Sequence, residues 1–218
     1  MLDDVSQLPH KIQEHIIETT SRELTHRNEQ VHVTELLYCL RKAYLRRTLP
    51  EISRDIEQRW YTYRGIVFDQ LWTGLFDRNQ VRVTHRIPDG PTIVGVIDFI
   101  AYENDEPVIY ELKTIANRYA IKNGPKDDHI KQVKFYAYCE NVLRAKLVYV
   151  SFEGVKIFDI HATDAPVTVY WLEDRARQLY EALKKKIPPA KTDREWECRY
   201  CEVADHCAAI EGVGEGVA

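Results

Sequence analysis

The stretch Val94-Gly95-Val96-Ile97-Asp98-Phe99-Ile100, followed after a short polar segment by Pro107-Val108-Ile109-Tyr110-Glu111-Leu112-Lys113, decides the fold of this chain. Both segments are short apolar runs rich in Val, Ile, Phe and Tyr, and the residues between them have the composition of a turn. This pattern predicts two antiparallel strands. Asp98, Glu111 and Lys113 are charged residues in strands that read as buried, where an isolated charge is costly to desolvate. We therefore expect these residues to be paired with one another or bound to a metal ion.

The spacing of the charged residues favours a divalent metal site. Side chains alternate along a strand, so Glu111 and Lys113 share a face, while Leu112 points away and leaves its carbonyl at the same edge. Carboxylates, a carbonyl and water are the ligands that a hard ion such as Mg²⁺ or Mn²⁺ prefers. Taken alone, the pattern also fits ordinary edge-strand charges, with Lys113 paired to one of the carboxylates.

A helix-forming segment follows the hairpin at about residues 126–145, and Gln132 and Tyr136 lie four residues apart on one of its faces. In this order and spacing, Asp98, Glu111-Leu112-Lys113 and Gln132-x3-Tyr136 resemble the RecB-type branch of the PD-(D/E)xK nuclease superfamily. The resemblance implies an α/β fold of the restriction-endonuclease type, with a mixed sheet flanked by helices. The catalytic residues that it implies are Asp98, Glu111, Lys113, Gln132 and Tyr136.

Asp69 is a further candidate ligand on a predicted helix from about residue 53 to 76, where apolar residues keep a helical spacing. In the resembled branch a G-x-x-x-H pattern supplies a metal ligand, and here Gly65 is followed four residues later by Asp69. A carboxylate also suits a hard ion. The alternative is a solvated helix charge. The metal ligands implied by the resemblance are Asp69, Asp98, Glu111 and the carbonyl of Leu112.

The composition limits the class of protein. The chain has 218 residues, of which 44% are hydrophobic, enough for one sizeable core. It has no apolar run of about 18 residues and no signal-peptide pattern at its start, which predicts a soluble, cytoplasmic protein without membrane association. The net charge of −4 gives no global argument for nucleic-acid binding. Five cysteines in such a chain indicate metal chemistry rather than a disulfide framework.

The spacing of the last three cysteines is the second strong signal. Cys198, Cys201 and Cys207 form the pattern C-x2-C-x5-C, which predicts a bound metal or cluster. Three clustered cysteines need a fourth ligand, and the candidates are Cys39, Cys139 and His206. A zinc site completed by His206 is one possibility that the residues alone leave open.

The order of the cysteines around the carboxylates is similar to that of the CRISPR-associated RecB-like iron–sulfur nucleases, the fourth Cas protein family. This family pairs an N-terminal cysteine followed by Arg-Lys, here Cys39-Leu40-Arg41-Lys42, with a C-terminal cysteine triplet. The similarity implies a [4Fe-4S] cluster held by Cys39, Cys198, Cys201 and Cys207. Cys139 lies on the predicted helix with Gln132 and Tyr136, and we expect it to pack in the core. The nuclease domain of the AddB helicase subunit shares this arrangement, but it ends a far longer polypeptide.

The resemblance also implies a function and a domain organisation. The expected activity is that of a Mg²⁺- or Mn²⁺-dependent exonuclease that trims mainly single-stranded DNA during spacer acquisition, in partnership with the CRISPR integrase complex. The expected regions are a helical region with one cluster cysteine (1–52), a nuclease core (53–187) and a cluster region with a flexible tail (188–218). Two alternatives are a non-cutting scaffold that binds single strands and a DNA-repair nuclease with a structural zinc site.

The remaining periodicity predicts further elements. One helix is expected over residues 33–47, with Thr34 as its N-cap. A second hairpin is expected from strands at 146–152 and 155–160. A long helix is then expected to begin at Asp164 and to run to about residue 186.

Overall fold

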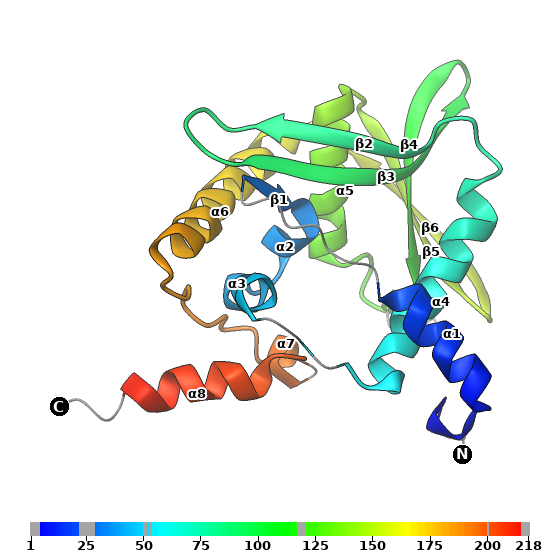
Figure 1. Cartoon of the computed structure of the whole chain (residues 1–218). Coiled ribbons are helices and arrows are strands. Elements are labelled where there is room, and N and C mark those ends of the chain that lie inside the picture. The colour runs from blue at the N-terminus through cyan, green and yellow to red at the C-terminus, as the bar shows by residue number, and fades with distance from the viewer. Residues whose placement is uncertain are drawn as a thin grey trace.

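The hairpin expected from the sequence is confirmed and lies at the centre of the fold (Figure 1). β3 (Thr92–Glu103) and β4 (Glu106–Thr114) run antiparallel. Asn104 and Asp105 connect them with φ angles of 52° and 63°, the left-handed conformation that a two-residue hairpin turn requires. The computed structural model describes residues 5–21, 29–49, 52, 54–116, 121–199 and 201–214.

Six strands form one sheet, and the predicted mixture of parallel and antiparallel strands is confirmed. The strands besides β3 and β4 are β1 (Gln30–His32), β2 (Asn79–Arg86), β5 (Arg144–Ser151) and β6 (Gly154–His161). The order is β1-β3-β4-β5-β6, with β2 paired to β3. The pairs β1/β3 and β4/β5 are parallel, and the pairs β2/β3, β3/β4 and β5/β6 are antiparallel. The predicted second hairpin is thus confirmed as β5 and β6.

One edge of β3 is divided between two partner strands. Residues 92–94 pair with β1 and residues 99–103 pair with β4, while β2 pairs along the opposite edge. Within the described part of the chain, residues 95–98 have no ladder partner on the divided edge. Beyond Tyr110, β4 leaves β3 and pairs with β5 alone. We call this divergence, formed by residues 95–98 and 111–114, the fork.

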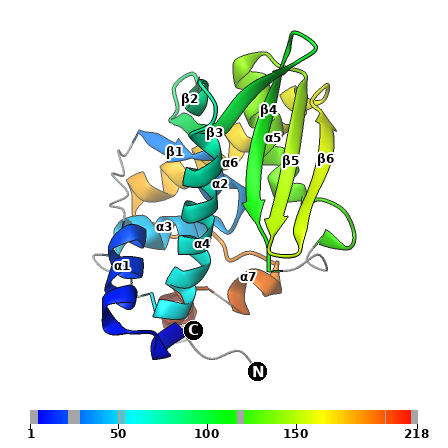
Figure 2. The ribbon, with the colours of Figure 1, turned by 90° about the vertical axis from the view of Figure 1, so that its right-hand side faces the viewer.

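Helices cover both faces of the sheet. Figure 2 shows α4 (Ile56–Thr73) in front of the sheet and α5 (Asp127–Glu140) and α6 (Ala165–Lys185) behind it. α4 begins at Asp55, whose carboxylate accepts the N–H of Gln58 at 2.7 Å, a typical N-cap. Among the helices of the described residues, none is long and apolar enough to cross a membrane.

The shorter helices bring the two ends of the chain together. α3 lies near α7 and α8 below the sheet in Figure 1, and α1 packs against α4. The bounds of these elements are Val5–Gln7 for η1, His10–Thr20 for α1, Val33–Leu37 for α2, Leu40–Thr48 for α3, Glu195–Arg199 for α7 and Ala204–Gly214 for α8.

The prediction of one continuous helix over residues 33–47 is wrong, because the chain breaks between α2 and α3 at Tyr38 and Cys39. Thr34 is also not the N-cap. That position is His32, whose N–H donates to Glu35 Oε2 at 2.8 Å. The break places Cys39 at the start of α3 instead of in mid-helix.

Two arginines from distant parts of the chain stabilise this break. Arg175 of α6 donates to the carbonyls of Leu36 and Tyr38, and Arg194 donates to the carbonyl of Leu37 at 2.7 Å. The carbonyls at the end of α2 are therefore satisfied without a continuing helix. Apolar periodicity cannot reveal such a break, because the partners lie more than a hundred residues away.

Other boundaries also differ from the prediction. The sequence reading missed β1 and β2. α5 ends at Glu140 instead of continuing to Ala145, because Asn141 adopts a left-handed conformation with φ of 54° and its N–H donates to the carbonyl of Ala137. The long helix α6 begins after Asp164, as predicted, with proline in its first turn.

The core lies between the sheet and the helices behind it. It is built from side chains that are fully buried, among them Ile93, Ile97, Phe135, Leu147 and Leu172. Burial of this apolar surface holds β3, β4 and α5 in a fixed relation. The polar side chains at the fork are therefore presented by a rigid frame.

Candidate functional site

Asp98 stands at the fork, immediately beyond the last pair of the β3/β4 ladder. Its carboxylate accepts the backbone N–H of Leu112 at 2.6 Å. The side chain therefore joins the two strands where the backbone ladder has ended. The predicted use of the Leu112 carbonyl as a metal ligand stays a prediction.

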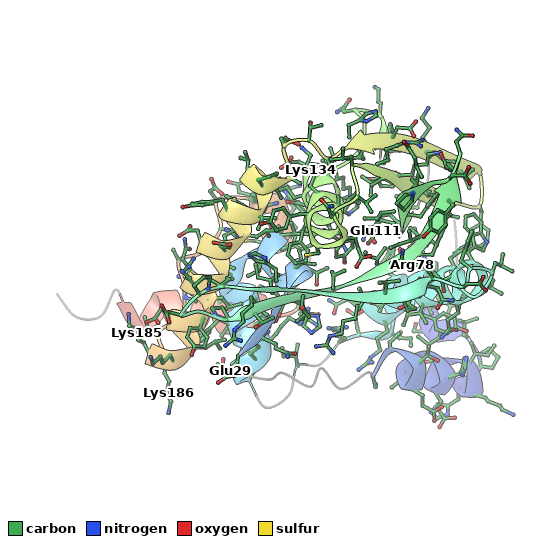
Figure 3. All side chains as sticks on the ribbon, turned by 90° about the horizontal axis from the view of Figure 1, so that it is seen from above. Glu29, Arg78, Glu111, Lys134, Lys185 and Lys186 are labelled. Carbon is green, nitrogen blue, oxygen red and sulfur yellow. The ribbon has the colours of Figure 1, made fainter. Side chains whose placement is uncertain are left out.

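Glu111 lies on the other arm of the fork, and its residue is only 3% exposed. Oε1 accepts hydrogen bonds from Lys113 Nζ at 2.7 Å and from Gln132 Nε2 at 2.8 Å. Oε2 is buried and has no hydrogen-bond partner among the residues that the structure describes. Figure 3 shows Glu111 in the interior of the molecule, in contrast to Lys185 and Lys186 at the outer end of α6.

The electrostatics of the fork disfavour two bare carboxylates. Burial, followed by the charge of Glu111, raises the pKa of Asp98 to about 8, although the Leu112 N–H and Lys113 act in the opposite direction. Burial also raises the pKa of Glu111, and Lys113 offsets only part of this effect. Burial alone would lower the pKa of Lys113, but Glu111 and Asp98 outweigh it and raise the value. A cation at the fork would stabilise both carboxylates in their ionised form.

Gln132 and Tyr136 lie behind Glu111 on α5, and both are buried. The amide of Gln132 donates to the Tyr136 hydroxyl at 2.8 Å as well as to Glu111. Burial, followed by the charge of Glu111, raises the pKa of Tyr136 well above its usual value, which keeps the phenol neutral. In this arrangement the two side chains fix the position of Glu111. Their predicted contact with DNA stays a prediction.

Gly95 leaves space for the Tyr136 ring behind Glu111. This role was not predicted from the sequence. A Cβ atom at this position would lie 2.5 Å from Tyr136 Cε1 and 3.2 Å from Val33 Cγ1. The first distance is too short for any real carbon–carbon contact, so a residue with a side chain would displace the Tyr136 ring. Gly95 within an apolar strand was the available signal, because an isolated glycine there often marks close approach of another group.

Asp69 reaches the same region from α4. It is partly buried, and both carboxylate oxygens accept from Gln80 Nε2 at 3.2 Å. Its charge contributes to the raised pKa values of Asp98 and Glu111, which places it within electrostatic range of both. The charges of the three carboxylates that were predicted from the sequence thus influence one another.

The three carboxylates suit a hard divalent ion by their chemistry. In the described part of the chain, no three His, Cys, Asp or Glu side chains already converge in a metal-holding geometry. Glu111 Oε2 nevertheless has no hydrogen-bond partner among the described residues, and the raised pKa values of Asp98 and Glu111 indicate a deficit of positive charge. These residues therefore fit an ion of the Mg²⁺ or Mn²⁺ type.

Cys39, Cys198, Cys201 and Cys207 line one cavity with a volume of about 1020 Å³, which we call the cysteine cavity. Each of the four cysteines is half-buried. Arg41 Nη1 donates to Cys207 Sγ at 3.6 Å, and the N–H of Cys39 donates to Glu197 Oε2 at 2.8 Å. Four thiols that line one cavity, with basic residues beside them, suit a thiolate-bound metal or cluster by their chemistry, although no three of them already lie in a metal-holding geometry among the described residues.

The two rival ligands lie apart from this cavity. His206 is exposed on α8 and is not part of the cavity wall. Cys139 packs against the core from α5, as predicted, and burial raises the pKa of its thiol to about 12. Of the three candidates for a fourth ligand, Cys39 alone shares the cavity with the cysteine triplet.

The cysteine cavity and the fork are neighbours. Tyr38 lines the cavity, and burial raises its pKa, while the charge of Lys113 at the fork acts in the opposite direction. Lys126 lines the same cavity, and its backbone N–H donates to the hydroxyl of Tyr149 at 3.0 Å. Tyr149 is paired with Lys113 in the β4/β5 ladder. The sequence reading missed both tyrosines.

Comparisons with known proteins give a family match and a shared fold. The sequence model of the PD-(D/E)XK nuclease superfamily matches residues 3–208. The comparison with curated proteins gave no significant match. Among solved structures, SSO0001 has a TM-score of 0.70 at 20% identity, over 91% of this chain and 97% of that chain, which shows a shared fold. An alkaline exonuclease from Laribacter hongkongensis has a TM-score of 0.46 at 16% identity, over 79% of this chain and 97% of that chain.

Proposed function

Because the chain belongs to the PD-(D/E)XK nuclease superfamily, we propose that it is a metal-dependent deoxyribonuclease that trims the ends of mainly single-stranded DNA. The observation that carries this proposal is the state of Glu111. One of its oxygens is held by Lys113 and Gln132, and the other is buried without a partner among the described residues. A carboxylate fixed in this way is suited to accept an ion.

The residues of the fork have separate roles in the proposed reaction. Asp98, Glu111 and the Leu112 carbonyl, together with Asp69, would hold one or two ions against the phosphate. A bound Mg²⁺ or Mn²⁺ lowers the pKa of water and offsets the charge that develops on the phosphate.

Lys113 would orient the attacking water by donating a hydrogen bond to it, since its ammonium group lies beside Glu111. Gln132 and Tyr136 would keep Glu111 aligned from behind, so that little reorganisation is needed when the phosphate reacts. Burial of the fork strengthens each of these electrostatic contacts.

We further propose that a [4Fe-4S] cluster occupies the cysteine cavity, held by Cys39, Cys198, Cys201 and Cys207. The common cavity of the four thiols supports this ligand set, and the exposed position of His206 disfavours it as a ligand. A cluster bound in this way would link α3 to the C-terminal segment.

The order of cysteines and carboxylates along the chain supports membership of the CRISPR-associated RecB-like iron–sulfur nucleases. The proposed role is then spacer acquisition beside the CRISPR integrase complex. The proposed regions are 1–52 with one cluster cysteine, 53–187 as the nuclease core and 188–218 as the cluster region. Residues 1–4, 22–28, 50–51, 53, 117–120, 200 and 215–218 of these regions lie outside the described residues.

A nuclease assay tests the proposed activity. Labelled single-stranded DNA is incubated with Mg²⁺ or Mn²⁺ and with the wild type, Glu111→Ala or Glu106→Ala. Glu106 is a matched control, because it is a carboxylate of the same strand β4 whose side chain is 68% exposed. We expect degradation by the wild type and by Glu106→Ala, and none by Glu111→Ala.

The other outcomes point to the alternative functions. Binding of single strands without degradation by the wild type would indicate a scaffold protein. Equal degradation by the wild type and Glu111→Ala would place the active site elsewhere. A colourless preparation that contains zinc and no iron would contradict the iron–sulfur cluster while leaving the nuclease proposal intact.

A further inference from the structure

His129 shares the face of α5 that supports Glu111. It lies three residues before Gln132 and seven before Tyr136, so the three side chains are stacked along one side of the helix. Its ring lies against Tyr149, which is fully buried and is paired with Lys113 in the β4/β5 ladder. His129 is thus held beside the lysine of the fork, although none of the proposed roles uses it.

The contacts of Tyr149 determine which nitrogen of His129 carries the proton. The Tyr149 hydroxyl accepts the backbone N–H of Lys126 at 3.0 Å and lies 2.8 Å from His129 Nδ1. If Nδ1 carried the proton, the hydroxyl would accept twice, and its own hydrogen would have no acceptor among the described residues at this buried position. We therefore assign the hydroxyl as the donor to Nδ1, which places the proton of the neutral imidazole on Nε2.

The surroundings of His129 keep it neutral. Burial lowers its pKa to about 3, and the charges of Lys113 and Lys126 act in the same direction. Tyr149 also keeps its proton, because burial raises its pKa. His129 is only partly buried, and its Nε2 has no hydrogen-bond partner among the residues that the structure describes. The structure thus holds a neutral N–H donor of fixed tautomer next to the fork.

We propose that His129 is a further catalytic residue, whose Nε2–H donates a hydrogen bond to a non-bridging oxygen of the phosphate bound beside Lys113. This inference rests on the proposed nuclease function and deepens it. A neutral donor suits this place, because it stabilises the negative charge that develops on the phosphate without competing with the metal for the carboxylates. Tyr149 then acts as a positioning residue that fixes the tautomer of His129.

Three substitutions of His129 test the proposal in the cleavage assay with single-stranded DNA and Mn²⁺. His129→Leu removes the donor, His129→Gln keeps an N–H near the position of Nε2, and His129→Asn moves it toward the position of Nδ1. We expect kcat to fall about 100-fold in His129→Leu and in His129→Asn, and to stay within about fivefold of the wild type in His129→Gln. We expect KM to stay within about threefold in all variants, because the bond forms chiefly in the transition state.

A double-mutant cycle separates this role from packing. Tyr149→Phe should lower kcat about threefold to tenfold in the wild type, because it frees the tautomer, and should have no effect on kcat in the His129→Gln background. A loss of the same size in both backgrounds would mean that Tyr149 acts only through the fold, and it would overturn the assigned tautomer lock.

The outcomes also distinguish this inference from the proposed function. If the wild type does not cut, both are overturned. If the wild type cuts, Glu111→Ala does not, and His129→Leu retains the wild-type kcat, then the nuclease function stands and the role of His129 is overturned. Melting temperatures of all variants are measured alongside. If His129→Leu proves unfolded, the comparison of His129→Gln with His129→Asn decides the matter, with equal kcat values contradicting the proposal.

Discussion

At the fork, Asp98 and Glu111 come from adjacent strands of one hairpin, whereas the four cysteines of the cysteine cavity come from opposite ends of the chain. Glu111 and Asp98 are held by direct hydrogen bonds to Lys113, Gln132 and the Leu112 backbone. The four cysteines line one cavity, with contacts to single thiols such as the bond from Arg41 to Cys207. The protein itself therefore fixes the first site more fully than the second.

Because of this difference, we expect the loss of the bound group to affect mainly activity at the fork and mainly stability at the cysteine cavity. The fork keeps its geometry through the ladder and through α5, so the loss of its ion should cost catalysis and little folding energy. The cysteine cavity lies between α3 and the C-terminal segment, so a group bound there would hold distant parts of the chain together. Its loss should cost folding energy first and activity as a consequence.

The largest expected effect follows from breaking the proposed link at Cys39. Cys39 and Cys198 enclose about 160 residues, and closing a loop of that length is worth roughly 5 kcal/mol on the chain-entropy estimate. We expect Cys39→Ser to lose iron, sulfide and visible absorption, and to lower the melting temperature by roughly 10–20 °C. Iron and sulfide assays combined with calorimetry measure this.

Two matched substitutions control for the loss of any thiol or side chain. Cys139→Ala removes a thiol that packs against the core outside the cavity, and His206→Ala removes the exposed rival ligand. Both variants should keep their iron. If His206→Ala bleached the protein and Cys39→Ser did not, the site would be confined to the C-terminal segment and the contrast between the two regions would fail.

The next effect concerns the ion at the fork. Glu111→Gln keeps an oxygen that can accept from Lys113 and Gln132, but it removes the charge. We expect cleavage to fall about 10³-fold or more, equal to about 4 kcal/mol in the barrier. At a Mn²⁺ concentration of 100 times its Kd, the wild type should gain about 2.7 kcal/mol of stability.

The melting temperature of Glu111→Gln should not respond to Mn²⁺, and in metal-free buffer it should equal or exceed that of the wild type, because a costly buried charge is gone. A metal-free variant that is strongly destabilised would show that Glu111 holds the fold together, contrary to the contrast drawn between the two regions.

A smaller effect is expected at Asp69, which is less buried than Glu111. Asp69→Ala should lower cleavage about 10- to 100-fold, whereas Asp69→His should retain measurable activity with a shift from Mg²⁺ toward Mn²⁺, because imidazole is a softer ligand. Metal-dependent rates of the two variants measure this. If Asp69→Ala cut DNA at the wild-type rate, Asp69 would be a solvated charge on α4 and not a metal ligand.

The sequence predicted those parts of the fork that depend on local pattern. Alternating apolar residues around Asp98 and Glu111 were sufficient for the hairpin, and helical spacing placed Gln132 and Tyr136 on one face of α5. The register that stops the β3/β4 ladder beside Asp98 could not be read in this way. It depends on β1 and β4 sharing one edge of β3, which is a property of the whole sheet.

The break between α2 and α3 at Cys39 is a second feature that the local sequence pattern could not predict. Residues 33–47 have a helical pattern throughout, and the interruption depends on Arg175 and Arg194, which satisfy the carbonyls of α2 from far along the chain. Tertiary partners of this kind override local propensity. The position of Tyr149 beside His129 could not be predicted for a similar reason, since it follows from the parallel pairing of β4 with β5.

The smallest expected effect is that of Gly95→Ala, which tests whether the side chains at the fork are held rigidly, as the comparison with the cysteine cavity assumes. In Gly95→Ala the new methyl group would lie 2.5 Å from Tyr136 Cε1, so the buried ring must move. We expect a loss of about 1–3 kcal/mol in the free energy of unfolding, as for other overpacked cores. Cleavage should fall by less than about tenfold, because Gln132 moves together with Tyr136 and aligns Glu111 less well.

Gly74→Ala is the matched control for Gly95→Ala, because a Cβ there would make only an ordinary contact of 3.6 Å and the backbone has φ of −61°. It should leave cleavage unchanged and stability unchanged or slightly raised. The cause of the Gly95→Ala effect is then tested in a Tyr136→Leu background, where the clashing atom is absent. If the clash is responsible, Gly95→Ala should cost less stability there than in the wild type. An equal cost in both backgrounds would mean that the strand at Gly95 resists a side chain for its own reasons, and that Tyr136 is free to move behind Glu111.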